Sequence, residues 1–585
     1  MVALPQRTDR HRPSVQSLRH SVLLRATREP YHRGMERRSR WVVAAALVLI
    51  VIGIGFRFWR LDGPVFCTDE TVGAYHAAGY RTAEVRGRFW GERPVRASEA
   101  REFYSPRPSG SARDVVAGLA HEDALHPPLF YVAERWWLEF AGSSVVVRRT
   151  LPALFGVLGI LAAGWLCALA TRRAIGGWVG AALYALSPFQ VVYAQEMLEY
   201  SLFATLTCAS TALLLLVLRR PGFVPLAAYA LAAAAGLYTF PLFTLVIAAH
   251  VTITLVLRVP GATVLRVVAA TAAAVAAWLP WLWSIIELRG KLASTGDWSG
   301  TRWSASAIVL KALFNASTAF FDATYADVRW APVTALVLLT IAVALVSLGK
   351  APPETRAVVW SLLSWCFGSL VLMDFAAGGH RSTVVRYIVP ALCALVVATA
   401  AWVASAWDRP RRSATPAGIA FALCAAGMVS LFVRAHYAAW WDDAKDGGLP
   451  AIVAAIDSAR VPVLVTDLNW QMVLDISNYT RTDPTFMMVP ADRVRQVAMR
   501  MGRVLVLTSS KASRSQIRDD AHLHTELVYV SATAASSVSL FRGRFVNDSG
   551  GGERDPDVED SLATLLRVES PAAVAGATHQ SAIGL

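Results

Sequence analysis

Apolar segments of membrane-spanning length recur along most of this 585-residue chain. A helix that crosses the hydrocarbon core of a bilayer needs about 20 mostly apolar residues. About eleven segments meet this requirement, and they lie at 41–58, 148–170, 175–194, 200–218, 222–238, 240–258, 263–286, 332–349, 356–375, 387–406 and 416–434. Only 17% of the residues are charged, against about 25% in soluble domains. The chain is therefore predicted to be a mainly α-helical polytopic membrane protein.

Two of these segments, 222–238 and 240–258, allow a second interpretation. They are separated by a short stretch that contains Pro241. Proline removes a backbone donor and interrupts a helix. The pair is therefore either two spans or one long helix that is broken at Pro241.

The basic residues predict the orientation of the chain. Residues 1–40 contain ten Arg and three acids, which contributes 10 − 3 = 7 to the net charge of +14. Because Lys and Arg accumulate on the cytoplasmic side of a membrane, this segment is predicted to be a cytoplasmic tail at the inner (cytoplasmic) membrane. The short loops that would share its side are all basic: Arg172–Arg173, Arg219–Arg220, Arg258 to Arg266, Lys350 to Arg356, and Arg409–Arg412. The charge is explained by topology, and no nucleic-acid partner is expected.

The polar regions predict four parts of the chain. The basic tail, 1–40, precedes a transmembrane domain, 41–435, which carries external loops at 59–147 and 287–331. Strand-like runs beginning at Val463 and Val504, separated by helical patterns at 449–459 and 490–501, predict a small extracytoplasmic α/β domain at 436–547. The segment 548–585 is rich in Gly, acidic residues, Ala and Ser and is predicted to be disordered.

Two polar clusters stand in the first external loop. Asp69 and Glu70 are adjacent and precede a helical pattern, where acids commonly stabilise the positive end of the helix dipole. His126 begins the run His-Pro-Pro-Leu-Phe-Tyr, which leads into an aromatic helix. That pattern is also typical of a helix lying at the membrane interface.

Two further clusters lie at the predicted outer ends of spans. Glu196, Glu199 and Tyr200 fall within one short turn, and carboxylates so close to lipid are unusual. The fourth cluster enters the span at 387–406 and comprises His380, Arg381, Arg386 and Tyr387. Cationic groups on that side oppose the insertion bias, which indicates an anionic ligand such as a phosphate. A plain ion pair between Arg386 and Asp374 is the structural alternative.

The order of these motifs resembles a known family. It runs Leu-Asp-Gly-Pro then Asp-Glu, His-Pro-Pro-Leu-Phe-Tyr, Val-Arg-Arg with Leu-Pro-Ala-Leu-Phe-Gly, Leu-Ser-Pro-Phe with Tyr-Ala-Gln-Glu, and Arg-Tyr with a following Pro. Over residues 45–405 it is similar to the membrane glycosyltransferases of the GT-C fold that are related to protein O-mannosyltransferases and lipid A aminoarabinose transferases. In one place it departs from them, because many relatives have Gln-Glu-x-Arg-x-Tyr where this chain has Leu198 in the Arg position and Glu199 before Tyr200.

The resemblance implies a reaction and a set of roles. Such enzymes transfer a sugar from a polyprenyl-phosphate carrier to an acceptor on the extracytoplasmic face, here an unknown lipid, glycan or protein. Asp69 is then expected to be the general base, with Glu70 as its hydrogen-bonding or metal-coordinating neighbour. Arg386, supported by His380 and Arg381, is expected to bind the phosphate. The remaining candidates are Glu196 and Glu199 for the sugar, and His126, Tyr200 and Tyr387 for the lining of the same cavity.

A cofactor is not fixed by these residues. No nucleotide-binding Gly-rich loop is present. Relatives differ in their need for a metal, so a divalent cation such as Mg or Mn held by Asp69, Glu70 and Glu196 stays open.

Two other functions stay open as well. A lipid or polysaccharide transporter would carry charged residues at mid-membrane and discontinuous helices. A receptor or assembly protein would use its external domain to bind a partner and would not need the Asp-Glu pair.

Overall fold

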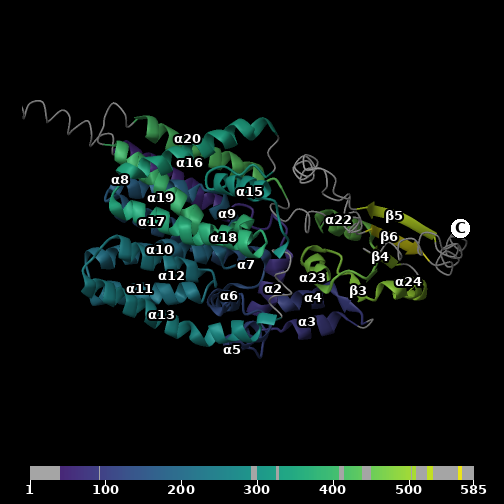
Figure 1. Cartoon of the computed structure of the whole chain (residues 1–585). Helices are drawn as coiled ribbons and strands as arrows, with labels where there is room; N and C mark the ends of the chain where they lie inside the picture. The colour runs from purple at the N-terminus through teal and green to yellow at the C-terminus, as the bar shows by residue number, and fades with distance from the viewer. Residues whose placement is uncertain are drawn as a thin grey trace, which may run out of the picture.

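The computed structural model describes residues 40–90, 93–290, 300–324, 328–407, 414–437, 449–501, 504–508, 524–530 and 564–569. The basic tail before residue 40 and the basic loop at 409–412 lie outside these residues. Figure 1 shows a bundle of long helices with a sheet at one end of it, here called the sheet end.

Eight described helices are long and apolar enough to cross a membrane. They are Arg40–Phe58, Val145–Thr171 (α7), Tyr200–Arg219 (α10), Gly261–Glu287 (α13), Ala331–Lys350 (which contains α16, Ala331–Ser347), Pro353–Ala377, Val389–Ala406 (α19) and Thr415–Arg434 (in α20, Ala414–Arg434). Pro353–Ala377 comprises α17 (Pro353–Leu363), a π-helical turn (Ser364–Gly368) and α18 (Ser369–Ala377). A bent pair, α8 (Ala174–Ala185) and α9 (Pro188–Ala194), makes nine spans if it counts as one.

The predicted number of about eleven spans is not reached, because the two ambiguous segments form short helices. They are α11 (Phe223–Leu237), with 15 residues, and α12 (Phe243–Val256), with 14. At 1.5 Å per residue each is about 21–22 Å long, less than the roughly 30 Å of a hydrocarbon core. The interruption contains Pro241, as one of the two interpretations requires.

Small residues allow the central helices to approach closely. A Cβ atom on Gly159 of α7 would lie 2.5 Å from the Tyr184 hydroxyl of α8 and 2.8 Å from Oγ1 of Thr205 in α10. Close packing through glycine is typical of helices in membranes. Gly159 therefore fixes how near α7 lies to its two neighbours.

The bend between α8 and α9 measures 61° and is stabilised by a buried arginine. Pro188, the first residue of α9, cannot continue the hydrogen bonding of α8. Arg57, at the end of the first span, donates to the freed carbonyls of Ala185 at 2.6 Å and Tyr184 at 3.3 Å. A cation at a helix C-terminus is favourable, which explains a fully buried Arg57.

Short helices fill the predicted external loops. The segment between the first two spans contains α2 (Thr68–Ala77), α3 (Thr82–Phe89), α4 (Ala97–Arg101), a 3₁₀ turn (Glu102–Tyr104), α5 (Ala112–Glu122) and α6 (Pro128–Ala141). The described part of the second loop contains α15 (Ala305–Ser317) and a 3₁₀ turn (Val328–Trp330). Two 3₁₀ turns, Arg381–Thr383 and Val385–Tyr387, lead into α19.

The α/β arrangement predicted after residue 436 is present as a small mixed sheet. Its strands are β2 (Val463–Thr466), β3 (Thr485–Met488), β4 (Val504–Thr508), β5 (His524–Val530) and β6 (Thr564–Glu569), with helices α22 (Leu449–Ala459), α23 (Trp470–Tyr479) and α24 (Val494–Met501) and a 3₁₀ turn (Ala491–Arg493). The strand order is β1-β3-β2-β4-β6-β5, in which β1 is the two-residue strand Val95–Arg96. The three strands β3, β2 and β4 are parallel neighbours, and the outer pairings are antiparallel.

Two strands of this sheet depart from the predicted boundaries. Strand β6 lies within 548–585, so the prediction of disorder does not hold for these six residues. Strand β1 (Val95–Arg96) comes from the loop at 59–147 and pairs antiparallel with β3. The segment at 59–147 and the C-terminal sheet are thus joined into one structure at the sheet end of the bundle.

Candidate active site

Helix α2 carries the two adjacent acids that the sequence singles out. The Glu70 carboxylate accepts a hydrogen bond from the backbone N–H of Cys67 at 3.0 Å, which satisfies one of the donors that a helix start leaves free. Successive side chains of a helix do not face the same way. The Asp69 side chain is 41% exposed, whereas Glu70 is fully buried. The two acids therefore meet different surroundings.

Glu70 holds three segments of the chain together. It accepts hydrogen bonds from Nε and Nη2 of Arg149 in α7, at 2.8 and 2.5 Å. It also accepts one from the backbone N–H of Met197 at 2.8 Å. Both oxygens are thus engaged by donors of the protein. Glu70 is predicted to be a hydrogen-bonding or metal-coordinating neighbour of Asp69, and in the described structure its hydrogen bonds are with Arg149 and with backbone N–H groups.

Asp69 meets the arginine predicted to bind phosphate. Nη1 of Arg386 donates to Oδ2 of Asp69 at 2.8 Å, across 317 positions of sequence. The guanidinium carbon lies 5.9 Å from the ring centres of both Tyr200 and Tyr387, which is cation–π range. One carboxylate and one cation from distant segments therefore form a single site together with two of the predicted tyrosines.

The alternative partner of Arg386 is used elsewhere. Asp374, near the end of α18, accepts the backbone N–H groups of Arg381 at 2.9 Å and Ser382 at 2.7 Å. It also lies 3.5 Å from Nη1 of the Arg381 side chain. Asp374 thus shapes the turn before α19, and the ion pair of Arg386 is with Asp69.

A second polar group adjoins Asp69. Nδ1 of His126 lies 2.8 Å from Oδ2 of Asp123, and its Nε2 lies 3.7 Å from Oε1 of Glu199. The Tyr131 hydroxyl donates to Glu199 at 2.8 Å. Burial lowers the pKa of His126, but the carboxylates of Asp123 and Glu199 outweigh that effect and raise the pKa to about 10, with a smaller contribution from Asp69. The two carboxylates thus favour the cationic form of His126, which lies between them.

For three other predicted residues the structure records contacts or neighbours outside the Asp69–Arg386 pair. His380 stacks on Trp303 at 4.5 Å and contacts the carbonyl of Thr301, and the Arg381 side chain donates to the Gly378 carbonyl at 2.7 Å. Both therefore support the turn before α19. Glu196 is partly buried beside Gln195, whose amide donates to the carbonyls of Phe56 and Trp59 at the end of the first span.

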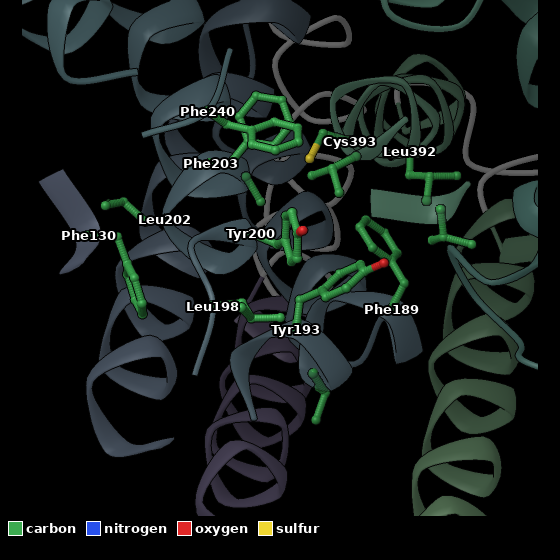
Figure 2. Close-up of a cluster of buried hydrophobic side chains, with 14 of the residues drawn as sticks. Phe130, Phe189, Tyr193, Leu198, Tyr200, Leu202, Phe203, Phe240, Leu392 and Cys393 are labelled. Carbon is green, nitrogen blue, oxygen red and sulfur yellow. The ribbon is translucent and has the colours of Figure 1, made fainter. Parts of the chain in front are cut away.

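Aromatic side chains of the helix bundle pack against Tyr200, which belongs to the polar site. Figure 2 shows Tyr200 in a cluster of buried side chains that includes Tyr193, Phe203 and Phe240. The Tyr200 ring lies 5.1 Å from that of Tyr193 and 5.5 Å from that of Phe240. Tyr200 thus has aromatic neighbours in the bundle and the Arg386 guanidinium over its ring.

Helix α23 of the C-terminal sheet region supports the segment that bears Asp69. The Tyr479 hydroxyl accepts the backbone N–H of Phe66 at 2.6 Å, and Asp475 accepts hydrogen bonds from the hydroxyls of Thr68 and Thr71. Three residues just before and within α2 are thereby fixed. The sheet region thus helps to set the position of Asp69.

A metal does not fit the predicted ligands. Among the described residues, no group of three or more His, Cys, Asp or Glu could hold a metal ion. Glu70, one of the three acids considered, already has both oxygens engaged by Arg149 and backbone donors.

Sequence reasoning missed Asp123 and Tyr479, and it assigned no role to Arg149, which it noted only as part of the Val-Arg-Arg motif. Arg149 carries the same signal that singled out Arg386, a cation at the end of a span that runs against the insertion bias. Asp123 stands three residues before His126. Tyr479 had no signal of its own, since its partner is 413 positions away.

Comparisons with known proteins concern the fold. No protein-family model matches the sequence, and no curated protein matches it. Among solved structures the chain is similar to ArnT from Cupriavidus metallidurans bound to undecaprenyl phosphate, with 13% identity, coverage of 91% of this chain and 98% of that chain, and a TM-score of 0.48. It is also similar to the oligosaccharyltransferase AglB from Archaeoglobus fulgidus in complex with an inhibitory peptide and a dolichol-phosphate (12% identity, coverage 79% and 69%, TM-score 0.43). A third similarity is to the arabinofuranosyltransferase AftD from Mycobacteria (13% identity, coverage 91% and 40%, TM-score 0.42). These similarities to GT-C glycosyltransferases are at low sequence identity and concern the arrangement of the chain alone.

Proposed function

We propose that this chain is a membrane glycosyltransferase that moves a sugar from a polyprenyl-phosphate carrier to an acceptor hydroxyl at the sheet end of the bundle. The observation that supports it most is the 2.8 Å contact between Asp69 and Arg386. Transfer from a lipid phosphate needs a base for the acceptor and a cation for the departing phosphate. These two groups meet where α19, a candidate span, begins.

Asp69 suits the role of the base. In the reaction the acceptor oxygen attacks the anomeric carbon and gives its proton to a carboxylate, while the bond between that carbon and the phosphate oxygen breaks. Asp69 is partly exposed, so an incoming hydroxyl can reach it. Glu70 is a positioning residue, because its contacts hold the first turn of α2 against α7.

Arg386 suits the role of the phosphate ligand. The electron pair of the broken bond leaves with the phosphate, whose added charge a guanidinium stabilises by two parallel hydrogen bonds. A phosphate that binds Arg386 competes with the Asp69 carboxylate for the N–H groups of the guanidinium. Donor binding would in this way release the Asp69 carboxylate to accept the proton.

His126 and Glu199 suit the recognition of the sugar. His126 is held between two carboxylates and Glu199 is held by the Tyr131 hydroxyl. Fixed donors and acceptors of this kind orient sugar hydroxyl groups at low entropic cost.

The transporter alternative finds less support in the described residues. Each Asp, Glu, Lys or Arg that is buried in a candidate span lies close to one of its ends, and the furthest, Arg149, is four residues after Val145. The one discontinuous span has its bend satisfied by Arg57. Charge at mid-membrane, which a transport pathway would favour, is thus not found in the described spans.

The proposal is tested with purified protein and a panel of polyprenyl-phosphate sugars, by measuring the polyprenyl phosphate released when envelope acceptors are added. One donor class should be turned over. Asp69→Asn should lower that turnover about 100-fold or more, the usual scale for losing acid–base help, at an unchanged melting temperature. Near wild-type turnover of Asp69→Asn would remove Asp69 from the mechanism. Failure to bind or turn over any donor would contradict the proposed class.

A further inference from the structure

A cavity lies at the end of the bundle opposite the candidate active site. Its volume is about 600 Å³, and it is lined by the ends of α10, α12 and α17 and by the residues that adjoin them. One of its lining residues, Arg172, directly follows α7. That helix begins beside the candidate site, where Arg149 binds Glu70, and its 27 residues span about 40 Å. The cavity is therefore separate from the site that contains Asp69.

The rim of the cavity carries an excess of positive charge. Its lining contains four arginines and one acid, Arg172, Arg219, Arg258, Arg356 and Glu354. The acid is engaged by two of the arginines, with Arg172 at 2.6 Å and Arg219 at 3.2 Å. The side chains of Arg258 and Arg356 are exposed and form no hydrogen bond or ion pair with the residues that the structure describes. Arg258 and Arg356 thus lie at the mouth of the cavity and have no anionic partner among the residues that the structure describes.

Below this rim the lining is apolar. Leu215 lies one helical turn before Arg219 in α10, and Trp360 lies about two turns after Pro353 in α17. Trp360 is 49% exposed and Val256 of α12 is 59% exposed. The cavity therefore has a cationic mouth and a hydrophobic wall that runs along the helices toward the middle of the bundle.

We infer that this cavity binds an anionic glycerophospholipid of the surrounding membrane. The lipid phosphate would lie between Arg258 and Arg356, and one acyl chain would follow Val256 and Trp360. A basic pocket between helix ends suits an acidic headgroup, while a soluble anion would gain nothing from the exposed side chains of Trp360 and Val256. The orientation predicted from the basic loops assigns the lipid to the cytoplasmic leaflet. The inference does not depend on the glycosyltransferase reaction.

The test is a lipid titration of the full-length protein in a neutral detergent, read by native mass spectrometry. Phosphatidylglycerol and phosphatidylcholine with the same acyl chains are compared. Phosphatidylglycerol should bind roughly tenfold to thirtyfold more tightly, which corresponds to about 1 kcal/mol for each of two arginines. The double substitution Arg258→Gln/Arg356→Gln should abolish this preference.

A matched control removes the same charge outside the cavity. Arg220 and Arg266 are exposed at the same end of the bundle and do not line the cavity, so Arg220→Gln/Arg266→Gln should retain the preference. Equal binding of the two lipids, or equal loss in both double variants, would overturn the inference. Displacement of the lipid by sn-glycerol 3-phosphate at a similar concentration would show a phosphate site in place of a lipid site.

Discussion

Removal of Arg149 should destabilise the sheet end more than the loss of an exposed ion pair. All five N–H donors of its guanidinium are used. Two bind the Glu70 carboxylate at 2.8 and 2.5 Å, and three bind the carbonyls of Leu61, Pro64 and Val65 at 2.8 Å each. Arg149 thereby ties the chain after the first span, the start of α2 and the start of α7 into one unit.

The size of the effect follows from what each substitution leaves behind. Arg149→Met keeps the length of the side chain but leaves Glu70 as a buried, unpaired charge, a change that costs about 3–5 kcal/mol. Arg149→Lys keeps the charge with only three donors, so it should lose less. In Arg149→Met/Glu70→Gln no buried charge is left alone, and part of the loss should be recovered.

Thermal unfolding in detergent can be followed with the chain's own thiols. Five of the six cysteines, namely Cys167, Cys208, Cys366, Cys393 and Cys424, are buried, so a thiol-reactive dye reports their exposure on heating. The midpoint should fall in the order wild type, Arg149→Lys, Arg149→Met, with the double variant above Arg149→Met.

The control is Arg88→Met, which breaks a partly exposed pair with Glu99 of a kind worth about 0–1 kcal/mol. An Arg149→Met midpoint no lower than that of Arg88→Met would refute the reasoning. So would a double variant no more stable than Arg149→Met.

Three further predictions address other parts of the site. Arg386→Ala should weaken donor binding by about 1.5–3 kcal/mol, and Arg386→Lys should recover only part of it; unchanged donor affinity in a titration would remove Arg386 from the site. His126 has its pKa raised to about 10 by Asp123 and Glu199, which outweigh burial. The stability that it adds is therefore complete below about pH 6.5, the pKa of an unperturbed histidine, and is lost as the pH rises toward 10. The melting temperatures of wild type and His126→Gln should converge over that range, and a constant difference would speak against the ion pairs. Tyr479→Phe leaves the Phe66 N–H without its acceptor and should cost about 1–3 kcal/mol, measured as a lower melting temperature; an unchanged one would show that α23 does not support α2.

Much of the fold was predictable because apolar length and basic loops are local properties of the sequence. All eleven predicted segments are helical over most of their length. The number of membrane spans was less predictable. A short interruption separates α11 from α12, and its position leaves each helix too short to cross a membrane. Strand β1 could not be foreseen, because two residues carry no periodicity and their partner β3 is far along the chain.

The candidate site was predictable to a different degree for each residue. The sequence singles out Asp69 and Arg386 separately, for their charge at the membrane edge, and the structure brings them into contact. The sequence singles out Glu70 for the same reason, but in the structure Glu70 is buried and forms an ion pair with Arg149. Which of two adjacent acids faces inward depends on the packing of α2 against α7, and a single sequence does not contain that information.

The most direct test of the proposed function is an experimental structure of the chain with polyprenyl phosphate bound. The account predicts a phosphate oxygen within hydrogen-bond distance of the Arg386 guanidinium, and an Asp69 carboxylate that has moved away from Arg386 and faces the acceptor side. A phosphate bound elsewhere, with the 2.8 Å contact between Asp69 and Arg386 intact, would contradict it.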